Sequence, residues 1–296
     1  MFDLRYHVAS LAAVFFALVI GILVGVALAS HGLGNTERNR LEEDLRRAEN
    51  QRDTLSAQVD SLKKSGSADS AFVEATAKSV MANRLKGKKI ALLFVGSADN
   101  DVRSAVSRAL VEAGAGQPVR VRAVTVPIDV TKLARRLTNH PFLASYAGRS
   151  QVKNLGHALG QEFAGGKDTP LWNALESLIV EERGGSPKRP ADGVVIVRTA
   201  PPQNDPTASF LQGLYAGVRD VGVPAVGVER SDSAVSAVGV FKNAGLPTVD
   251  DVETPNGRLA LVVLLADSML GGNYGTKKLD QGLLPPVTTL PAPAGG

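Results

Sequence analysis

The sequence contains no cysteine, and it is poor in the other side chains that bind soft metal ions. It has four histidines and three methionines among 296 residues. The missing thiols exclude disulfide bonds, thiolate metal centres and cysteine nucleophiles. The histidines are dispersed, at His7, His31, His140 and His157. A metal site built on histidine needs several of them within a turn or two of one another, so the residues alone predict no metal site.

The sequence also lacks the signatures of common enzymes and of nucleic-acid-binding proteins. The patterns G-x-G-x-x-G, G-x-x-x-x-G-K-[ST] and G-x-S-x-G are absent. Local spacing brings no nucleophile and base together. Aromatic residues make up 5% of the chain, and its net charge of +4 is spread along the whole length. A nucleic-acid surface gathers basic residues and interleaves aromatic ones. We therefore predict neither an enzyme nor a nucleic-acid partner, and no cofactor is evident.

One stretch is long and apolar enough to cross a membrane: SLAAVFFALVIGILVGVALAS, Ser10 to Ser30. At about 1.5 Å per residue, such a helix spans a hydrocarbon core of about 30 Å. We predict a short N-terminal tail over residues 1–7 and an uncleaved transmembrane helix over residues 8–30. The alternative is a cleaved signal peptide, because Ala27-Leu28-Ala29 matches a cleavage motif. The apolar run is longer than a usual signal core, which favours the anchor.

The flanks of this run suggest an orientation. Arg5 is offset by Asp3 on the short side, so the charge bias is weak. We expect a single-pass protein of the cell membrane whose long C-terminal part is extracytoplasmic. Gly21 and Gly25 form a G-x-x-x-G pair, a pattern that lets two membrane helices approach closely.

Residues 35–64 carry a heptad repeat without glycine or proline. Its two apolar rows are Leu41, Ala48, Leu55 and Leu62, and Leu45, Arg52 and Val59. This a/d seam predicts a coiled coil, most simply a parallel homodimer. The alternative is a single solvated helix whose charges pair along its faces, but that helix would not need an apolar seam. We expect Arg52 to weaken the pairing and to set its register.

Apolar runs of strand length alternate with helical patterns over residues 88–276. The runs are KKIALLFV, VRVRAVTVPI, DGVVIVRTA, VPAVGVER and a short edge strand at Thr248–Val252. This alternation predicts an α/β head with a mainly parallel sheet of four or five strands, in a Rossmann- or flavodoxin-like arrangement. Residues 129–182 are expected to be polar and helix-rich. Residues 65–87, which begin with SGSADSA, are predicted to form a flexible hinge and a connecting helix, and the Pro/Gly-rich residues 277–296 a disordered tail.

The loops expected after the strands are acidic. In such a sheet, ligands bind beyond the carboxyl ends of the strands. The candidate residues there are Asp99, Asp101, Asp232, Asp250 and Asp251, with Asp129, Asp205 and Glu253 in the same loops. Together they predict a hard-cation or sugar site, or alternatively they cap the first turns of helices. The segment GGNYGTKK, Gly271–Lys278, offers either a phosphate site or a helix C-cap followed by a basic surface turn.

The order of these features is more specific than any one of them. The segments LRYHVASLAAVFFALVIGILVG and VDDVETPNGRLALVVLLADSMLGGNYGT, with the heptad region between them, resemble the mycobacterial copper transport protein B family. The resemblance covers nearly the whole chain and implies a role in copper homeostasis, with copper ion as the transported species. That family is described as outer-membrane pore formers, and we associate a histidine-rich tail with it. Residues 273–286 contain no histidine, so no copper ligand can be assigned here.

Three functional interpretations follow. The first is a membrane-anchored, oligomeric transport or accessory component in copper efflux. The second is a structural envelope protein whose stalk and head organise other envelope proteins without binding metal. The third is a small-molecule-binding head, based on the acidic loops. A single helix cannot enclose a channel by itself, and the sequence lacks the alternating strands of a membrane barrel, so we expect an accessory component rather than the conduit.

Overall fold

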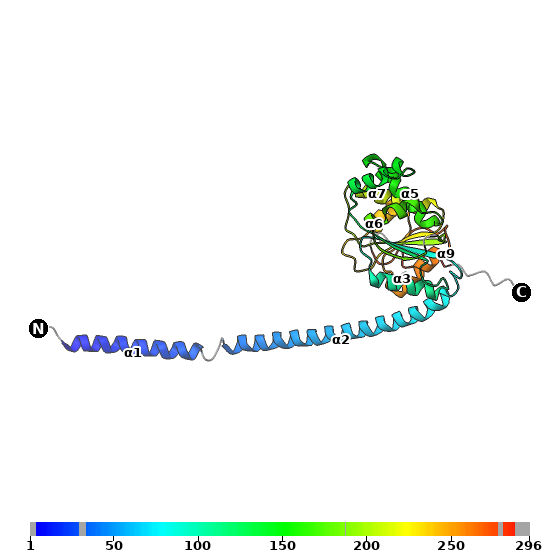
Figure 1. Cartoon of the computed structure of the whole chain (residues 1–296). Coiled ribbons are helices and arrows are strands. Elements are labelled where there is room, and N and C mark those ends of the chain that lie inside the picture. The colour runs from blue at the N-terminus through cyan, green and yellow to red at the C-terminus, as the bar shows by residue number, and fades with distance from the viewer. Residues whose placement is uncertain (1–3, 30–33, 187, 278–280, 288–296) are drawn as a thin grey trace. The chain divides into compact units, whose positions relative to one another are not determined.

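The computed structural model describes residues 4–29, 34–186, 188–277 and 281–287. The chain divides into two units, Met1–Asp69 and Ser70–Gly296. The elements, shown in Figure 1, are α1 (Leu4–Leu28), α2 (Gly34–Met81), β1 (Ile90–Val95), α3 (Asn100–Glu112), β2 (Arg120–Val124), α4 (Val130–Thr138), the 3-10 helices η2 (Ala144–Tyr146) and η3 (Arg149–Gln151), α5 (Val152–Gly165), α6 (Pro170–Ile179), β3 (Val180–Gly185), β4 (Gly193–Arg198), α7 (Thr207–Asp220), β5 (Ala225–Val228), α8 (Val238–Asn243), β6 (Thr248–Val249), α9 (Pro255–Ala266) and β7 (Asn273–Tyr274).

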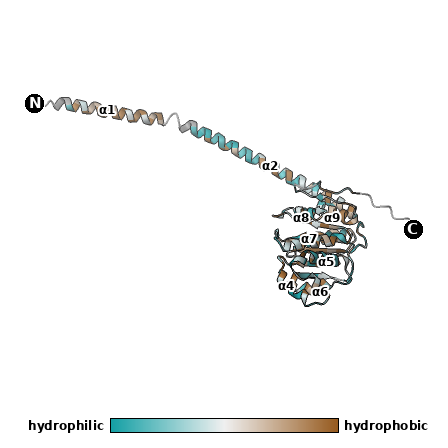
Figure 2. Cartoon of the chain, turned by 90° about the horizontal axis from the view of Figure 1, so that it is seen from above, coloured by the Kyte–Doolittle hydropathy of each residue, from teal (hydrophilic) through white to brown (hydrophobic). Residues whose placement is uncertain are grey.

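The first unit contains α1 and most of α2. Within α1, residues His7–Leu28 are long and apolar enough to cross a membrane, by length and composition. Figure 2 shows α1 in pale and brown, apolar colours and most of α2 in the teal of hydrophilic residues. Of the expected N-terminal tail, residues 4–7 are already helical, and residues 1–3 lie outside the described residues. Residue 30, the expected end of the membrane helix, also lies outside them.

Helix α2 differs from the sequence prediction at residues 65–71. The expected hinge is wrong as a break in secondary structure, because helix continues through this stretch. A single glycine, Gly66, costs a helix only about 1 kcal/mol relative to alanine, and the three serines and two alanines around it are tolerated in a helix. Ser67 also back-bonds within the helix, its Oγ donating to the Lys63 carbonyl oxygen at 2.8 Å. The small and polar residues of this stretch therefore do not interrupt the long helix.

The second unit contains one seven-stranded sheet with the order β3-β2-β1-β4-β5-β6-β7. All neighbouring pairs are parallel except β2 and β3. The expectation of a mainly parallel sheet is confirmed, and the expected number of strands is too low. The missed strands are the two at the ends of the sheet. Thr248–Val249 is therefore not an edge strand, because β7 pairs with its outer side.

Both missed strands lack the signal of a buried strand. The sequence of β3 is VEERGG, and its side chains alternate between half-buried and exposed, as at a sheet edge. It follows α6 without a break, so Glu181 and Glu182 looked like the end of a helix. Strand β7 has only two residues, which are held because the Thr248 amide donates to Gly272 O at 3.0 Å and the Asp250 amide to Tyr274 O at 3.1 Å.

Two hydrophobic cores lie on opposite faces of the sheet. In β1, Ala91, Leu93 and Val95 belong to the core beneath α4 to α8, and Ile90, Leu92 and Phe94 to the core shared with α3 and α9. Figure 1 shows α5, α6 and α7 on one side of the strands and α3 and α9 on the other. The alternation follows from the two-residue period of a strand. Burial on both faces explains why these strands are continuous apolar runs.

Helices α5 and α7 pack with their backbones in close approach. Each has two glycines four residues apart, Gly156 and Gly160 in α5, and Gly213 and Gly217 in α7. A Cβ atom at Gly160 would overlap the Leu214 carbonyl oxygen, and one at Gly213 would overlap the Lys153 carbonyl oxygen. These positions therefore accept no side chain without moving one helix.

The expected C-terminal tail is only partly described, because residues 278–280 and 288–296 lie outside the described residues. The segment between these gaps runs beside β7. The Gln281 amide donates to Asn273 O at 2.8 Å, and the Gly275 amide donates to Gly282 O at 3.0 Å.

Candidate functional site

The candidate site is a cleft of about 530 Å³ at the carboxyl ends of β1, β4 and β5. Chain connections leave β1 toward β2 and leave β4 toward β5, so the strand order reverses between β1 and β4. Open α/β sheets bind ligands at such a switch point. The polar residues that line the cleft are Asp99, Arg198, Thr199, Glu229, Arg230, Asp232 and Ser233.

Asp99 is the N-cap of α3. Its Oδ1 accepts hydrogen bonds from the Asp101 amide at 2.8 Å and the Val102 amide at 3.0 Å. In dinucleotide-binding sheets, the amides at this helix end hold a phosphate. Here a carboxylate of the protein already occupies them, and its charge disfavours a second anion. The preceding turn needs Gly96, whose φ is 101° and where a Cβ would lie 2.7 Å from Thr199 Oγ1.

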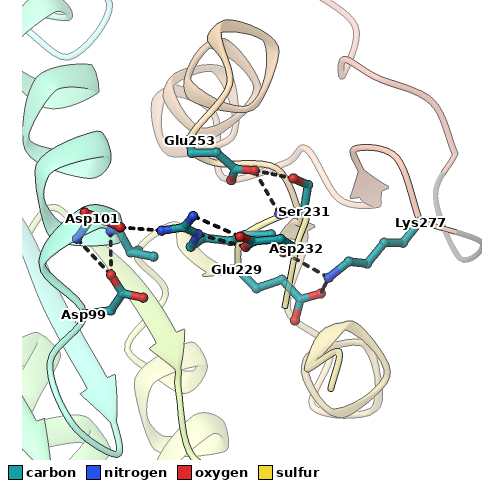
Figure 3. Close-up of polar contacts among 9 residues, drawn as sticks. Asp99, Asp101, Glu229, Ser231, Asp232, Glu253 and Lys277 are labelled. Atoms are coloured by element: carbon teal, nitrogen blue, oxygen red, sulfur yellow. Dashed lines mark hydrogen bonds and ion pairs between the residues drawn. The ribbon is translucent and has the colours of Figure 1, made fainter. Parts of the chain in front are cut away.

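Asp101 and Asp232 meet at one guanidinium, that of Arg230, although Asp101 is far away in sequence. Arg230 Nη1 donates to Asp101 Oδ2 at 2.6 Å. Its Nε and Nη2 donate to the two oxygens of Asp232 at 2.9 and 3.0 Å (Figure 3). The hydrogen bonds from Arg230 lower the pKa of Asp232, and those from Asp232 and Asp101 raise the pKa of Arg230. Both carboxylates are thus paired within the protein rather than directed at an open cation position.

Glu229 is buried, with 3% of its side chain exposed, and pairs with Lys277. Its Oε1 also accepts a hydrogen bond from Ser236 Oγ at 2.7 Å, and its Oε2 accepts one from the Ala237 amide at 2.5 Å (Figure 3 shows Glu229 and Lys277). Lys277 Nζ donates to Arg230 O at 3.0 Å. Lys277 is therefore turned inward as the counter-ion of a buried carboxylate. Neither expected role of GGNYGTKK describes it, and Lys278 lies outside the described residues.

The carboxylate of Asp250 fixes the segment that follows β7. The residue is fully buried. Its Oδ1 accepts from the Thr276 amide at 2.9 Å, and its Oδ2 accepts from the Lys277 amide at 3.1 Å. A Cβ at Gly275, whose φ is 139°, would overlap Asp250 Oδ1. Asp250 therefore uses both oxygens to hold the chain and does not line the cleft.

Asp251 is a buried carboxyl group with one unsatisfied oxygen. Thr254 Oγ1 donates to its Oδ2 at 3.0 Å, and its Oδ1 has no partner among the described residues. Burial, with a smaller contribution from the charges of Asp250 and Glu253, raises the pKa of Asp251 to about 6. A carboxyl group with these surroundings is partly protonated close to neutral pH.

The remaining acidic residues of the predicted set have local roles. Asp129 is the N-cap of α4 and accepts from the Lys132 amide at 3.0 Å. Asp205 accepts from the Ser209 amide at 3.1 Å, and Glu253 accepts from the Ser231 amide at 3.0 Å. The structure thus brings Asp99 and Asp232 to one cleft and pairs Asp101 with Arg230 of its lining, and it gives the others structural hydrogen bonds. Because Glu229 and Glu253 hold the loop after β5, α8 is shorter than the expected helix, which began at residue 231.

The described residues contain no group of three or more His, Cys, Asp or Glu side chains that could hold a metal ion. His157 Nε2 lies 3.0 Å from Asp220 Oδ2, and this contact, together with Arg219, lowers the pKa of Asp220. His140 Nδ1 is buried without a partner within the described part of the chain. His31 lies outside it.

Sequence reasoning missed the basic partners at this edge of the sheet. Arg230 and Lys277 pair with the acidic side chains, yet Arg230 stands alone between Glu229 and Ser231 in sequence, and Lys277 belongs to a short basic turn. The only available signal was charge balance: a buried strand followed by Glu-Arg, and a glycine turn followed by lysine. Neither pattern identifies its partner, since Arg230 and Asp101 are separated by 129 positions.

Comparison with known proteins gives two findings. A family model described as "Copper transport outer membrane protein, MctB" matches residues 1–285. Copper transporter MctB of Mycobacterium bovis and of Mycobacterium tuberculosis are each 26% identical to this chain over 306 aligned residues, which cover 93% of this chain and 95% of the relative.

Proposed function

Because the chain belongs to the MctB family, whose model is described as a copper transport outer membrane protein, we propose that it serves copper homeostasis and copper efflux in the cell envelope. The observation that carries this proposal is the extent of the match. The match covers α1, α2 and the whole described sheet. The chain is therefore similar to the family in its whole order of elements and not in one motif alone. The family description names transport and not catalysis.

The proposal places α1 in the membrane as an uncleaved anchor, with the C-terminal unit on the extracytoplasmic side. Its support is the apolar length of His7–Leu28, none of which is buried against the rest of the chain. The hydrocarbon core of a membrane contains no water, so the helix satisfies its backbone N–H and C=O groups with its own hydrogen bonds. A Cβ atom added at Gly21 or Gly25 would have no other atom within 4 Å. This open, side-chain-free surface suits close contact with the same helix of a second copy.

The stalk is proposed to pair with another copy as a parallel coiled coil. The seam side chains Leu41, Leu45, Leu55, Val59 and Leu62 are all exposed, with 47–71% of their surface free. A dimer would bury them in knobs-into-holes contacts. Arg52 in the seam has its charge met by Asp53 of the same helix, at 2.8 Å. This local pair reduces the repulsion between two Arg52 side chains at the seam.

The head is proposed to be a Rossmann-like domain that has no nucleotide chemistry. Its strand order runs outward from β1 and β4 as in doubly wound sheets, with β3 antiparallel. The phosphate position at the start of α3 is filled by Asp99. We therefore propose that the head serves as an assembly surface of an oligomeric transport component. Copper is then the transported species, and the described part of the head contributes no ligand cluster to it.

Deletion of the gene tests the copper role. Cells without the protein are expected to hold more copper and to stop growing at a lower copper concentration, and the wild-type chain is expected to restore both. Unchanged cell-associated copper and unchanged tolerance would contradict the proposal and favour the purely structural alternative. Tolerance to zinc serves as the control, because a general envelope defect would lower it as well.

A further inference from the structure

A second cavity lies between α7 and α8, at the side of the sheet that faces α5. Its volume is about 460 Å³, in the range of pockets for small organic molecules. It differs from the cleft in its charge: its lining contains no Asp or Glu and three basic residues, Lys153, Arg198 and Arg219. Arg198 is shared with the cleft, and the other lining residues are separate.

The cavity has an apolar floor. Leu211, Tyr215 and Ala216 line it from α7, and Val240 and Ala244 from α8 and its end. The Tyr215 ring packs edge-on against Phe241, with ring centroids 5.4 Å apart. This contact restrains the ring, which contributes an apolar surface to the cavity lining.

Tyr215, which lines this cavity, carries a buried polar group without a partner in the described part of the chain. That group is its hydroxyl, and the residue is 1% exposed. Buried hydroxyl groups are nearly always paired, because an unpaired one loses its hydration without compensation. Burial raises the pKa of Tyr215, so the group remains a protonated donor. A ligand atom that accepts this hydrogen bond would satisfy it.

Basic side chains stand at the same cavity. Arg198 Nε donates to Ala200 O at 3.2 Å and its Nη2 to Pro201 O at 2.9 Å, which fixes the guanidinium beside the loop. Lys153 is exposed and lines the cavity. No ion pair of its ammonium is found among the residues that the structure describes, so its charge is available to a ligand. Arg219 is already engaged with Asp220 at 2.8 Å and contributes less.

We propose that this cavity binds a small organic anion with a flat apolar body, whose acidic group faces Arg198 and Lys153 and accepts a hydrogen bond from Tyr215. The apolar floor holds the body of the ligand, and the rim supplies charge. An inorganic ion would use only the charged rim, and a neutral hydrocarbon would use only the apolar floor. The site does not rest on the proposed role in copper homeostasis.

Calorimetric titration of the full-length protein in a nonionic detergent with phenyl phosphate tests this site. We expect saturable binding with a dissociation constant at or below about 1 mM, and binding about tenfold weaker for phenol and for inorganic phosphate. Lys153→Gln and Tyr215→Phe are each expected to weaken phenyl phosphate binding by about three- to tenfold. Lys242→Gln, an exposed lysine of α8 outside the cavity, is the matched control and is expected to leave binding unchanged.

Three results would overturn the proposal. These are the absence of saturable heat with phenyl phosphate up to about 10 mM, equal affinity for phenol and phenyl phosphate, and variants at Lys153 and Tyr215 that bind like the wild type. Folding of Tyr215→Phe is checked by its thermal unfolding, which should match or exceed that of the wild type because the substitution removes an unpaired hydroxyl.

Discussion

Arg258 in α9 and Glu74 in α2 form an ion pair in which the arginine side chain is 4% exposed. Arg258 Nη1 also donates to the Glu253 carbonyl oxygen at 2.9 Å. Beside this pair, Ala77 and Met81 of α2 are buried in the core that α9 shares. The end of α2, from Ser70 onward, is thus built into the head, and its attachment depends on one charged contact as well as on apolar packing.

Glu74→Gln is expected to lower the free energy of unfolding of the head by about 1–3 kcal/mol, because it leaves the buried Arg258 without its counter-ion. Glu74 is 33% exposed, so water replaces part of the lost interaction and the loss falls below that of a fully buried pair. Denaturant unfolding of the full-length protein in detergent measures this, read by the fluorescence of Trp172, which is the single tryptophan and is buried in the head. Glu49→Gln, on the exposed part of α2, should change nothing, and equal stability of the two variants would contradict the prediction.

Gly160→Ala is expected to destabilise the head by about 1–3 kcal/mol or more, because the new Cβ overlaps a carbonyl oxygen of α7 and separates the two helices. The matched control is Gly239→Ala in α8, where nothing lies within 4 Å of the new atom. That variant should be neutral or slightly stabilising, since alanine favours helix. The same unfolding experiment compares them. If both substitutions had the same effect, close packing of α5 on α7 would not explain the glycines.

Asp251→Asn is expected to change how stability depends on pH. The folded-state pKa of Asp251 is raised from 3.8 to about 6, so the folded protein binds more protons than the unfolded chain between these values. Stability of the wild type therefore falls as pH rises from about 4 to about 6 and is then level, a loss of up to about 3 kcal/mol. The asparagine variant lacks this loss. Its free energy of unfolding should therefore equal that of the wild type near pH 4 and rise relative to it as the pH increases to about 6. Asp60→Asn, on exposed α2, is the control. A difference between the variant and the wild type that stays constant with pH would contradict the assignment.

Leu55→Asp is expected to weaken self-association of the full-length protein by about tenfold or more, because it places a charge in the proposed seam. Ala57→Asp adds the same charge on the same helix outside the seam and should leave association unchanged. Sedimentation or crosslinking in detergent distinguishes the two variants. A wild-type chain that is monomeric at micromolar concentration would argue against the paired stalk.

The hydrophobic periodicity of the chain located four of its buried strands and several helices, but it gave α4, α5 and α6 only as one helix-rich stretch. The strands β1, β4 and β5 were readable because burial on both faces makes them continuous apolar runs, and β2 because its apolar residues alternate with arginines. Helices α3 and α7 were readable because acidic or polar starts and glycine stops frame an apolar stripe. Strand β3 escaped because its exposed edge position allows charged residues, and β7 because two residues carry no period.

The candidate site was predictable only as a set of loops. That these loops gather at one edge follows from a parallel sheet: Asp99 and Asp232 line one cleft there, and Arg230 joins Asp101 to Asp232. What each carboxylate does depends on partners distant in sequence, such as Arg230 for Asp101 and the amides of Thr276 and Lys277 for Asp250. Those pairings are set by tertiary packing and leave no local pattern.

We propose that the protein acts on copper while α1 holds it in the membrane. The decisive measurement is the cell-associated copper of a deletion strain that expresses one of two altered chains. In one chain α1 is replaced by an unrelated single membrane span, and in the other by a cleavable signal peptide that releases the rest. We predict that the first lowers cell copper to the wild-type level and that the second does not. Full restoration by the released chain, or failure of both chains and of the wild type, would contradict the account.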